Sequence, residues 1–407
     1  MKHSKTSRLL AGATTAALAA GGVAATGTAA HAAAQPYFTY TNGWRVDLHE
    51  RELADVNGDG NDDIVGFGDQ GTYVAFGRDD RTFEAPELVL DDYGYNQGWR
   101  VDQHPRELAD INGDGNADVV GFGTAGTYVS YGRSDGDLTA PALELRDFGT
   151  AQGWTTDEHL RVLGDVDGDG TADIVGFGNA GTYVSYGTAL HSPTAPELKL
   201  GSFGADGGWD EDRYPRTLAD VNGDGLQDIV GFGHAGTYVS YGQGDKTFTD
   251  PALKAQDFGW AQGWRVDQHP RKLADVNGDG YADVVGFGNA GTYVSYGQID
   301  GALIHPELVV RNFGWDQGWR VDQHPRELAY ANNDATADIV GFGNAGTYVA
   351  YGQPDETFTD AGLWLEEFGY DQGWRVGMYP RELADVNGDG RAEVVGFGYS
   401  QTLTEML

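Results

Sequence analysis

Residues 274–297 read ADVNGDGYADVVGFGNAGTYVSYG. The first ten of these residues place three carboxylates and one amide in a loop that two glycines keep open. Two runs rich in Val, Tyr and Phe follow, each bounded by glycine. Near copies of the stretch recur along the chain, so an explanation of this acidic loop has to hold for all the copies.

The dipeptide Gly-Trp marks a repeat of fixed length. The marker tryptophans are separated by 55 residues without insertion: Trp44, Trp99, Trp154, Trp209, Trp264, Trp319 and Trp374. A period this long and this regular indicates a repeat architecture. We number the seven units from the N-terminus.

Each unit carries four short apolar runs bounded by Gly, Pro, Asn and Asp. In the fifth unit they span residues 271–276, 282–287, 292–296 and 306–310, and all four have the character of strands. No helical periodicity is present. Four strands repeated seven times predict an all-β fold, a seven-bladed β-propeller over residues 33–407, with a linear solenoid as the alternative.

The two ends of the chain favour the propeller. The sequence stops within the third predicted strand of the last unit, whereas residues 36–38 match the end of a fourth strand. We therefore predict that an N-terminal strand completes the last blade and closes the ring, which a solenoid would not need.

Residues 1–32 have the pattern of a secretory signal peptide. Lys2, Lys5 and Arg8 precede an Ala-rich apolar run that ends in Ala30-His31-Ala32, a small-residue cleavage pattern. The run is too short and too often interrupted for a membrane anchor. We expect a secreted, extracellular protein without a membrane span.

The composition restricts the partners. The chain has a formal net charge of −36, 63 glycines and no cysteine. So negative a surface repels nucleic acid and anionic lipid. Without cysteine there are neither disulfides nor thiol catalysis, so packing, assembly or metal has to stabilise the fold.

The acidic loop has the ligand spacing of a calcium loop. Asp275, Asn277, Asp279 and Asp283 occupy positions 1, 3, 5 and 9, and the backbone carbonyl of Tyr281 falls at position 7. Position 12 is not the bidentate Glu of an EF-hand, and a strand follows. A solvated acidic turn is the alternative, but it would leave the repulsion between the carboxylates without compensation. We expect five to six structural Ca²⁺ sites.

The predicted metal ligands recur in six of the seven units. They are Asp55, Asn57, Asp59, Asn61 and Asp63; Asp110, Asn112, Asp114, Asn116 and Asp118; Asp165, Asp167, Asp169, Thr171 and Asp173; Asp220, Asn222, Asp224, Leu226 and Asp228; Asp275, Asn277, Asp279, Tyr281 and Asp283; and Asp385, Asn387, Asp389, Arg391 and Glu393. The seventh unit has a longer ligand at position 9. The sixth begins with Tyr330 and lacks both loop glycines, so we expect it to have lost its ion.

These motifs resemble a known family. The run Asp-Val-Asn-Gly-Asp-Gly-x-x-Asp followed by Val-Gly-Phe-Gly resembles the FG-GAP or VCBS repeat of integrin-α-type propellers, over about residues 36–407. The fuller unit, GWRVDQHPRELADVNGDG then VGFGNAGTYVSYG, is similar to the Psathyrella velutina lectin family. That resemblance implies calcium in the loops and pockets between blades for terminal N-acetylglucosamine.

A sugar pocket needs an aromatic face and fixed polar groups, so we looked for such positions outside the acidic loop. Candidates are the variable residue four before the marker Trp, the Trp itself, the Arg after it, a His and a second Arg. The candidate ligand-binding residues are Tyr95, Trp99, Arg100, His104 and Arg106; Trp260, Trp264, Arg265, His269 and Arg271; Trp315, Trp319, Arg320, His324 and Arg326; and Tyr370, Trp374 and Arg375.

Several of these positions also have a structural interpretation. The Trp and the second Arg occur in every unit, which favours packing between blades. Asn179, Asn289 and Asn344, with Tyr183, Tyr293 and Tyr348, could line the same crevice. The third and fourth units depart at two positions together, with Thr150 and Thr155 and with Ala205 and Asp210, so we expect weak pockets there.

Three functions remain open. The first is a non-enzymatic, multivalent lectin for N-acetylglucosamine-type glycans, and the second is an adhesion propeller that binds a protein partner. The third is a polysaccharide-degrading enzyme, which would need one blade with groups that the others lack. The sequence has no HExxH and no isolated acidic pair outside the predicted calcium loops.

Overall fold

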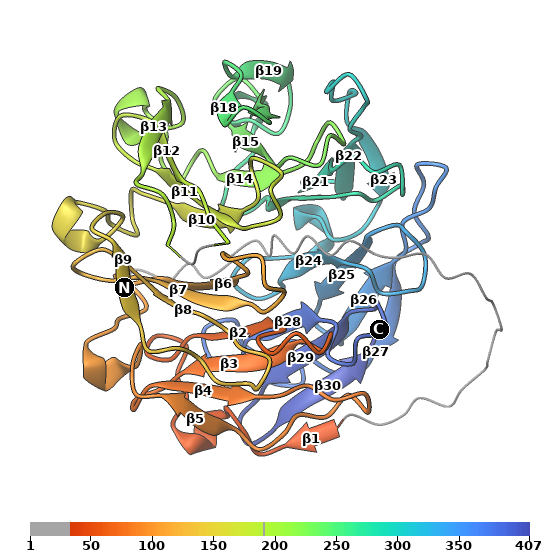
Figure 1. The fold of residues 1–407 in the computed structure, drawn as a ribbon. Coiled ribbons are helices and arrows are strands. Elements are labelled where there is room, and N and C mark those ends of the chain that lie inside the picture. Colours follow the sequence, from red (N-terminus) through yellow and green to blue (C-terminus); the bar gives the residue numbers. More distant parts are fainter. Residues whose placement is uncertain (1–32, 190–191) are drawn as a thin grey trace.

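The ring of sheets is the main feature of the molecule. A computed structural model describes residues 33–189 and 192–407, and the predicted signal peptide lies outside these residues. Seven four-stranded antiparallel sheets, the blades, surround a common axis (Figure 1). The fold is a seven-bladed β-propeller, so the solenoid alternative is excluded.

The blades repeat one strand order from the axis outward. The innermost strands are β2 (Arg51–Ala54), β6 (Arg106–Ala109), β10 (Arg161–Gly164), β14 (Arg216–Ala219), β20 (Arg271–Ala274), β24 (Arg326–Ala329) and β28 (Arg381–Ala384). The second strands are β3 (Asp63–Phe67), β7 (Asp118–Phe122), β11 (Asp173–Phe177), β15 (Asp228–Phe232), β21 (Asp283–Phe287), β25 (Asp338–Phe342) and β29 (Glu393–Phe397).

The outer half of each blade follows the same order. The third strands are β4 (Thr72–Ala75), β8 (Thr127–Ser130), β12 (Thr182–Ser185), β16 (Thr237–Ser240), β22 (Thr292–Ser295), β26 (Thr347–Ala350) and β30 (Thr402–Met406). The outermost strands are β5 (Glu87–Leu90), β9 (Ala142–Leu145), β13 (Glu197–Leu200), β19 (Ala252–Ala255), β23 (Glu307–Val310), β27 (Gly362–Leu365) and, in the last blade, β1 (Ala33–Gln35).

Short connecting elements complete the chain. The 3₁₀ turns are η1 (Tyr40–Asn42), η2 (Tyr95–Gln97), η3 (Thr150–Gln152), η4 (Ala205–Gly207), η5 (Trp260–Gln262) and η6 (Trp315–Gln317). A small hairpin, β17 (Gly242–Gln243) with β18 (Thr247–Phe248), extends the fourth blade. The four strands predicted in the fifth unit are confirmed, each ending within two residues of the expected position.

The N-terminus closes the ring, as predicted. Strand β1 pairs antiparallel with β30, with Ala33 opposite Thr404 and Gln35 opposite Thr402. The position of this strand differs from the sequence prediction, because the chain has already left the sheet at residues 36–38. There the Phe38 backbone has a φ of 51°, and its side chain is packed into the core, so the match to a fourth strand was misleading.

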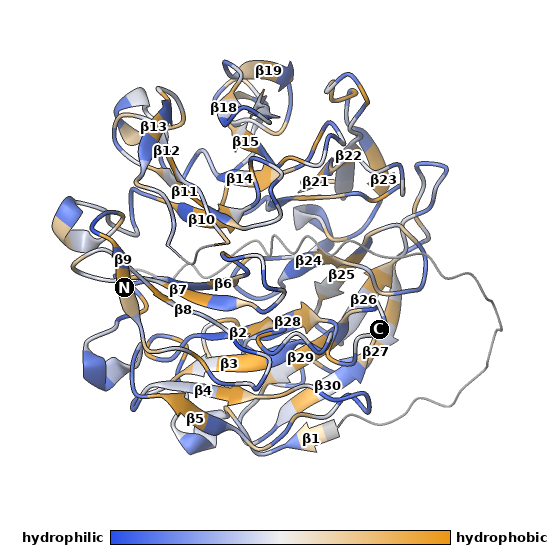
Figure 2. Cartoon of the chain, viewed as in Figure 1, coloured by the Kyte–Doolittle hydropathy of each residue, from blue (hydrophilic) through white to orange (hydrophobic). Residues whose placement is uncertain are grey.

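The apolar core lies between the blades. Seven clusters of buried side chains each combine residues of two neighbouring sheets; one joins Phe38, Leu53 and Ile64 of the first blade to Val395 and Phe397 of the last. Figure 2 shows hydrophobic residues on the strands and hydrophilic residues in the connecting loops. Because each sheet packs on both neighbours, no blade buries its faces alone.

Two aromatic rings pack directly against the glycine of the Val-Gly-Phe motif. A Cβ at Gly286 would lie 2.5 Å from Cε1 of Phe258 and 2.5 Å from Cη2 of Trp264. The indole N–H of Trp264 donates to Oδ1 of Asp257 at 2.9 Å, which fixes the ring over the glycine. In the other six units a Cβ at the equivalent glycine would likewise meet the rings of the equivalent Phe or Tyr and of the marker Trp.

A buried arginine ties each blade to the one before it. Nη1 of Arg271 donates to the carbonyl of Phe258 at 2.9 Å, and Phe258 has a left-handed backbone with a φ of 61°. The Arg271 guanidinium also lies over the ring of Phe232, in the preceding blade, 5.3 Å from its centroid. All seven units repeat the bond to the carbonyl thirteen residues earlier.

We expect Gly286→Ala to destabilise the protein strongly, because the two packed rings of Phe258 and Trp264 leave no room for a Cβ. The free energy of unfolding should fall by about 2 kcal/mol or more. The matched control is Gly362→Ala, at an exposed strand position where a Cβ meets nothing within 4 Å. Denaturant unfolding of both variants measures the difference, and an equal effect of the two would contradict the role given to Gly286.

Carboxylates also gather where the innermost strands meet. Glu382, the second residue of β28, has Arg51, Glu50 and Glu327 as its charged neighbours. Burial raises the pKa of Glu382 to about 8; Glu50 and Glu327 add to this shift, and Arg51 opposes it. Lys272 of β20 forms an ion pair with Glu327 of β24, so one cation links two neighbouring inner strands.

Glu382→Gln should therefore stabilise the protein at high pH only. The folded-state pKa of about 8 lies above the ordinary value of 4.5, so the unfolded chain loses this proton first and stability falls as pH rises between these values. We expect the variant to exceed the wild type by on the order of 1 to 3 kcal/mol at about pH 9 and to match it at about pH 4. Denaturant unfolding at the two pH values checks this, and a pH-independent difference would contradict it.

Candidate functional site

The acidic loops connect the innermost strand to the second strand of each blade. In the fifth loop the chain wraps around the carboxylate of Asp275, which accepts the backbone N–H of Gly278 at 2.6 Å and of Gly280 at 2.8 Å. Both glycines have positive φ, at 77° and 87°, a backbone that side chains disfavour. The first carboxylate and the glycines thus define the curl of the loop.

The aspartate at position 9 has a structural role that the sequence did not indicate. Oδ2 of Asp283 accepts the N–H of Val276 at 2.9 Å, and Oδ1 accepts the N–H of Gly297 at 2.8 Å. It thereby clamps the loop to the end of the third strand. Asp338 makes the same pair of bonds in the sixth unit, where the rest of the motif has degenerated. Retention of this residue therefore does not by itself indicate a metal.

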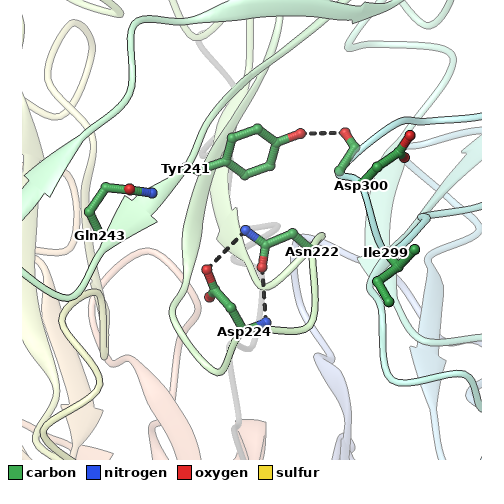
Figure 3. Close-up of a pocket in the computed structure, with 7 residues that line it drawn as sticks. Asn222, Asp224, Tyr241, Gln243, Ile299 and Asp300 are labelled. Atoms are coloured by element: carbon green, nitrogen blue, oxygen red, sulfur yellow. Dashed lines mark hydrogen bonds between the residues drawn. The ribbon is translucent and has the colours of Figure 1, made fainter.

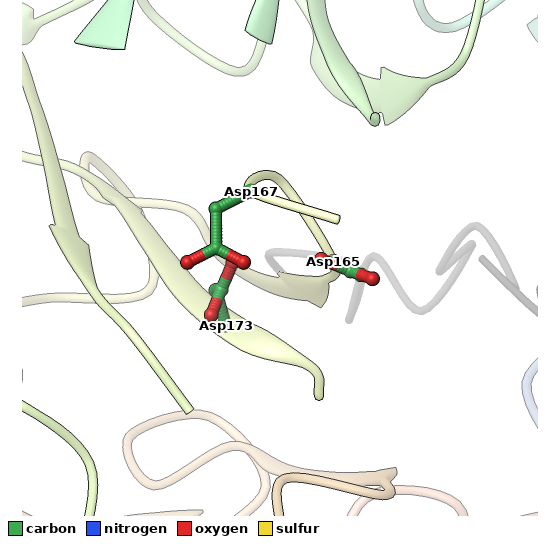
Figure 4. Close-up of side chains that lie close together, drawn as sticks. All are labelled: Asp165, Asp167 and Asp173. Atoms are coloured by element: carbon green, nitrogen blue, oxygen red, sulfur yellow. The ribbon is translucent and has the colours of Figure 1, made fainter. Parts of the chain in front are cut away.

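The third loop brings its carboxylates closest together. One oxygen each of Asp165, Asp167 and Asp173 lie within 4.8 Å of one another (Figure 4). Burial raises the pKa of Asp173 to about 8, with further contributions from the charges of Asp167 and Asp165. Such a cluster of oxygen ligands matches the preference of a hard divalent cation, and the donor types fit calcium.

The sixth and seventh loops differ from this pattern. In the sixth, Tyr330 replaces the first carboxylate, and Asn333 and Ala335 replace the two loop glycines. In the seventh, the guanidinium groups of Arg81 and Arg391 contact the predicted ligand Asp389 at 2.9 Å and 2.7 Å. Two arginine side chains, Arg81 of the first blade and Arg391 of the loop itself, thus form ion pairs with a carboxylate predicted to bind the metal.

A turn of the next blade covers each loop. Above the fourth loop, the Tyr241 hydroxyl donates to the Gly301 carbonyl, and a hollow of about 290 Å³ remains beside Asn222 and Asp224. Figure 3 shows Ile299 and Asp300 of the fifth blade on one side of this hollow. It is exposed and shallow.

A second kind of cleft lies at the opposite end of the blades. The acidic loop follows the end of the inner strand, whereas these clefts lie where the inner strand begins and where the second strand turns into the third. In the sixth blade a cleft of about 160 Å³ is lined by Asn312, Gln317, Gly318, Trp319, His324, Gly343, Asn344 and Tyr348. The candidate sugar residues therefore face away from the metal loops.

A buried histidine positions an exposed amide in this cleft. Nδ1 of His324 accepts the N–H of Arg320 at 3.1 Å, so its Nε2 carries the proton and donates to Oδ1 of Asn344 at 2.9 Å. Burial lowers the pKa of His324, which keeps the ring neutral. The amide NH₂ of Asn344 then lies at the exposed rim. His269 and Asn289 repeat the arrangement in the fifth blade.

The variable aromatic residue forms a stacked pair with the arginine after the marker Trp. The Arg320 guanidinium lies 3.7 Å from the centroid of Trp315, and its Nη1 donates to the Trp315 carbonyl at 2.8 Å. The same stacking occurs in five units: Arg45 on Tyr40, Arg100 on Tyr95, Arg265 on Trp260, Arg320 on Trp315 and Arg375 on Tyr370. Units three and four lack both partners, which explains why the two positions change together.

Each stacked aromatic lies beside the cleft of the preceding blade. The N–H of Trp315 donates to the Gly288 carbonyl at 3.0 Å, next to Asn289. In the sixth blade, Tyr370 bonds to the Gly343 carbonyl at 2.9 Å, and its ring lies 6.0 Å from that of His324. These two blades combine an exposed amide with a half-buried aromatic ring.

The other five clefts lack at least one part of this combination. The residue equivalent to Asn344 is Asp69, Thr124, Asn179, His234 or Tyr399. Asn179 has Ala205 beside it in place of an aromatic ring. In the last blade Tyr399 stacks on Tyr40, with centroids 5.8 Å apart.

The structure places some of the predicted ligand-binding residues at the surface and buries the others, which are the second arginines and the Trp and His residues. Tyr95, Trp260, Trp315 and Tyr370 are half-buried at the surface with their stacked arginines. The second arginines, Arg106, Arg271 and Arg326, are buried at the junctions between blades and bond to backbone carbonyls, so they do not line an open cleft. The Trp and His residues support the cleft from below, and little of their side chains is exposed to solvent. They are Trp99, His104, Trp264, His269, Trp319, His324 and Trp374, the last in a unit with Tyr379 at the His position.

Comparison with known proteins agrees with this architecture. Residues 110–176 and 220–286 match the FG-GAP-like repeat. The chain superimposes with a TM-score of 0.81 and 39% identity on a lectin from Agrocybe aegerita, solved in a study of its recognition of non-reducing terminal N-acetylglucosamine; the match covers 84% of this chain and 86% of that chain. No curated protein sequence matches significantly.

A second solved structure shares the fold alone. The Photorhabdus luminescens Tc holotoxin pore matches with a TM-score of 0.52 and 18% identity, over 92% of this chain and 17% of that chain. The molecule is thus a seven-bladed propeller built from FG-GAP-like repeats. It belongs to the Psathyrella velutina lectin family of propellers. Among the described residues no helix is long and apolar enough to cross a membrane.

Proposed function

We propose that this protein is a secreted, non-enzymatic lectin that binds glycans with terminal N-acetylglucosamine. The observation that carries the proposal is the exposed amide of Asn289 and of Asn344, each fixed by a buried His beside a half-buried aromatic ring. An amide and an aromatic face are the groups that recognise an acetamido sugar. The 39% identical lectin that recognises this sugar supports the same use of the clefts.

The clefts of the fifth and sixth blades should bind most strongly. Their shallow form predicts weak binding at each cleft, and several clefts on one ring raise the avidity for a clustered glycan surface by about 10² to 10⁴. The predicted leader at residues 1–32 supports export. Mass measurement of the exported protein tests that step.

Asn289→Ala with Asn344→Ala should weaken binding of N-acetylglucosamine. Each substitution removes hydrogen bonds worth about 0.5 to 1.5 kcal/mol, a loss of about 2- to 13-fold in affinity per cleft. Titration calorimetry with the monosaccharide, and a glycan array for avidity, measure the effect. Equal binding by wild type and the double variant would contradict the assignment.

Asn179→Ala is the matched control. This asparagine bonds to His159 at 3.0 Å as its counterparts do, but Ala205 stands in place of the aromatic ring. We expect unchanged binding. If this control loses as much affinity as the double variant, the aromatic ring has no part in recognition.

We further propose that loops one to five bind structural calcium. The converging carboxylates and the raised pKa of the buried aspartates, about 8 for Asp63, Asp118, Asp173, Asp228 and Asp283, support a cation that would relieve the burial of like charge. In the first, second, fourth and fifth loops no ion pair to the ligand carboxylates is found among the described residues.

Removal of calcium should lower the unfolding temperature. At a free concentration 100-fold above the dissociation constant, one site stabilises the fold by about 2.7 kcal/mol. Calorimetric scans in about 10 mM Ca²⁺ and in chelator give the shift, with Asp279→Asn expected to reduce it. Identical scans in the two buffers would refute the calcium sites.

A further inference from the structure

The turn that covers each acidic loop carries a residue that varies between blades. It is Arg81 over the seventh loop, Gly136 over the first, Lys246 over the third, Gly301 over the fourth and Glu356 over the fifth. All five have a left-handed backbone, with φ between 62° and 83°, so the turn presents the same position to each loop. A side chain at this position extends from one blade toward the acidic loop of the blade before it.

Arg81 bridges two of the predicted metal ligands of the seventh loop. Its Nε donates to Oε1 of Glu393 at 2.8 Å, and its Nη2 donates to Oδ2 of Asp389 at 2.9 Å. These ligands occupy positions 9 and 5 of the loop. The Glu393 side chain is fully buried, and its other oxygen still accepts the N–H of Val386 at 3.1 Å.

A second guanidinium completes the neutralisation. Arg391, at position 7, donates to both oxygens of Asp389, at 3.2 Å and 2.7 Å. Three carboxylates, Asp385, Asp389 and Glu393, thus have two fixed cations among them. The two guanidinium groups thus lie where the metal ion predicted for these residues would have to bind.

We propose that Arg81 takes the place of a metal ion in the seventh loop and holds the first blade to the last without calcium. The last blade is the one that its own chain segment does not complete, since β1 only pairs with β30, so a bond from the first blade to Glu393 of β29 holds the ring across this break. Asp62 adds a further bond across it, because its Oδ2 accepts the N–H of Asp385 at 2.9 Å. In the other six units the position equivalent to Asp62 is occupied by Ala or Gln, which cannot make this bond through a carboxylate.

The other loops show what the position does when the side chain changes. Over the fourth loop Gly301 has no side chain, and the hollow beside Asp224 stays open (Figure 3). Over the third loop Lys246 places Nζ 2.5 Å from Oδ2 of Asp167. That ammonium pairs with one carboxylate only, from an exposed side chain that also lies over the Tyr186 ring, so a metal ion can displace it. The planar guanidinium of Arg81 instead joins two carboxylates at once.

The test compares the wild type with a variant that combines Arg81→Ala, Arg391→Thr and Glu393→Asp. These changes recreate the ligand types of the third loop, which has Thr171 and Asp173 at the last two positions. The matched control is Arg78→Ala, which removes an arginine of the same hairpin whose partner is the exposed Glu84. Native mass spectrometry in Ca²⁺ counts the bound ions, and scanning calorimetry in chelator measures the unfolding temperature of the metal-free protein.

The proposal predicts two results. The triple variant binds one more calcium ion than the wild type, and in chelator it unfolds several degrees below both the wild type and the control, a loss that calcium restores. In addition, Asp385→Asn leaves the ion count of the wild type unchanged.

Three results would overturn the proposal. They are a wild-type ion count that falls with Asp385→Asn, a triple variant that unfolds like Arg78→Ala in chelator, and a loss of stability without an added ion. The ion count rests on the calcium proposed for the other loops. If no form of the protein binds calcium, that proposal fails and the inferred substitution fails with it, whereas a wild type with ions and an unchanged triple variant refutes the substitution alone.

Discussion

Each blade is held to its neighbour by one arginine that cannot reach solvent. The guanidinium bonds to the carbonyl of a left-handed Phe or Tyr and lies over an aromatic ring of the preceding sheet. That left-handed residue and the marker Trp in turn rest on the glycine of the second strand. Because this bond joins a carbonyl of the linker to a cation that lies between two blades, the path of the linker and the packing of the blade are coupled.

The sequence predicted the ring because the period is exact in length and each unit carries four strand patterns. It misplaced the closing strand, since residues 36–38 are apolar for another reason: Phe38 is the left-handed core residue of the linker. A three-residue strand such as β1 carries too little pattern to be located from composition. Its position follows from pairing with β30, a contact between the two ends of the chain.

The candidate site was predictable in part. Positions that vary between units, such as Trp315 and Arg320, do lie at the surface as a stacked pair. The buried His and second Arg were harder to interpret, because a residue repeated in every unit can either bind or pack, and only burial distinguishes the two. The bonds by which Asp283 holds the loop to the end of the third strand were not predicted, because the residue also fits position 9 of the metal motif. The cation from the neighbouring blade was not predictable, because Arg81 and Glu393 are 312 residues apart in sequence.

The pairing of β1 with β30 has a consequence for biosynthesis. Of the described strands, β1 is synthesised first and its partner β30 last, so until β30 is made the growing chain exposes an unpaired strand edge and one uncovered blade face. Unpaired strand edges and uncovered apolar faces are prone to aggregation, so the chain needs protection until β30 has emerged. The native topology becomes accessible only when β30 is available to pair with β1.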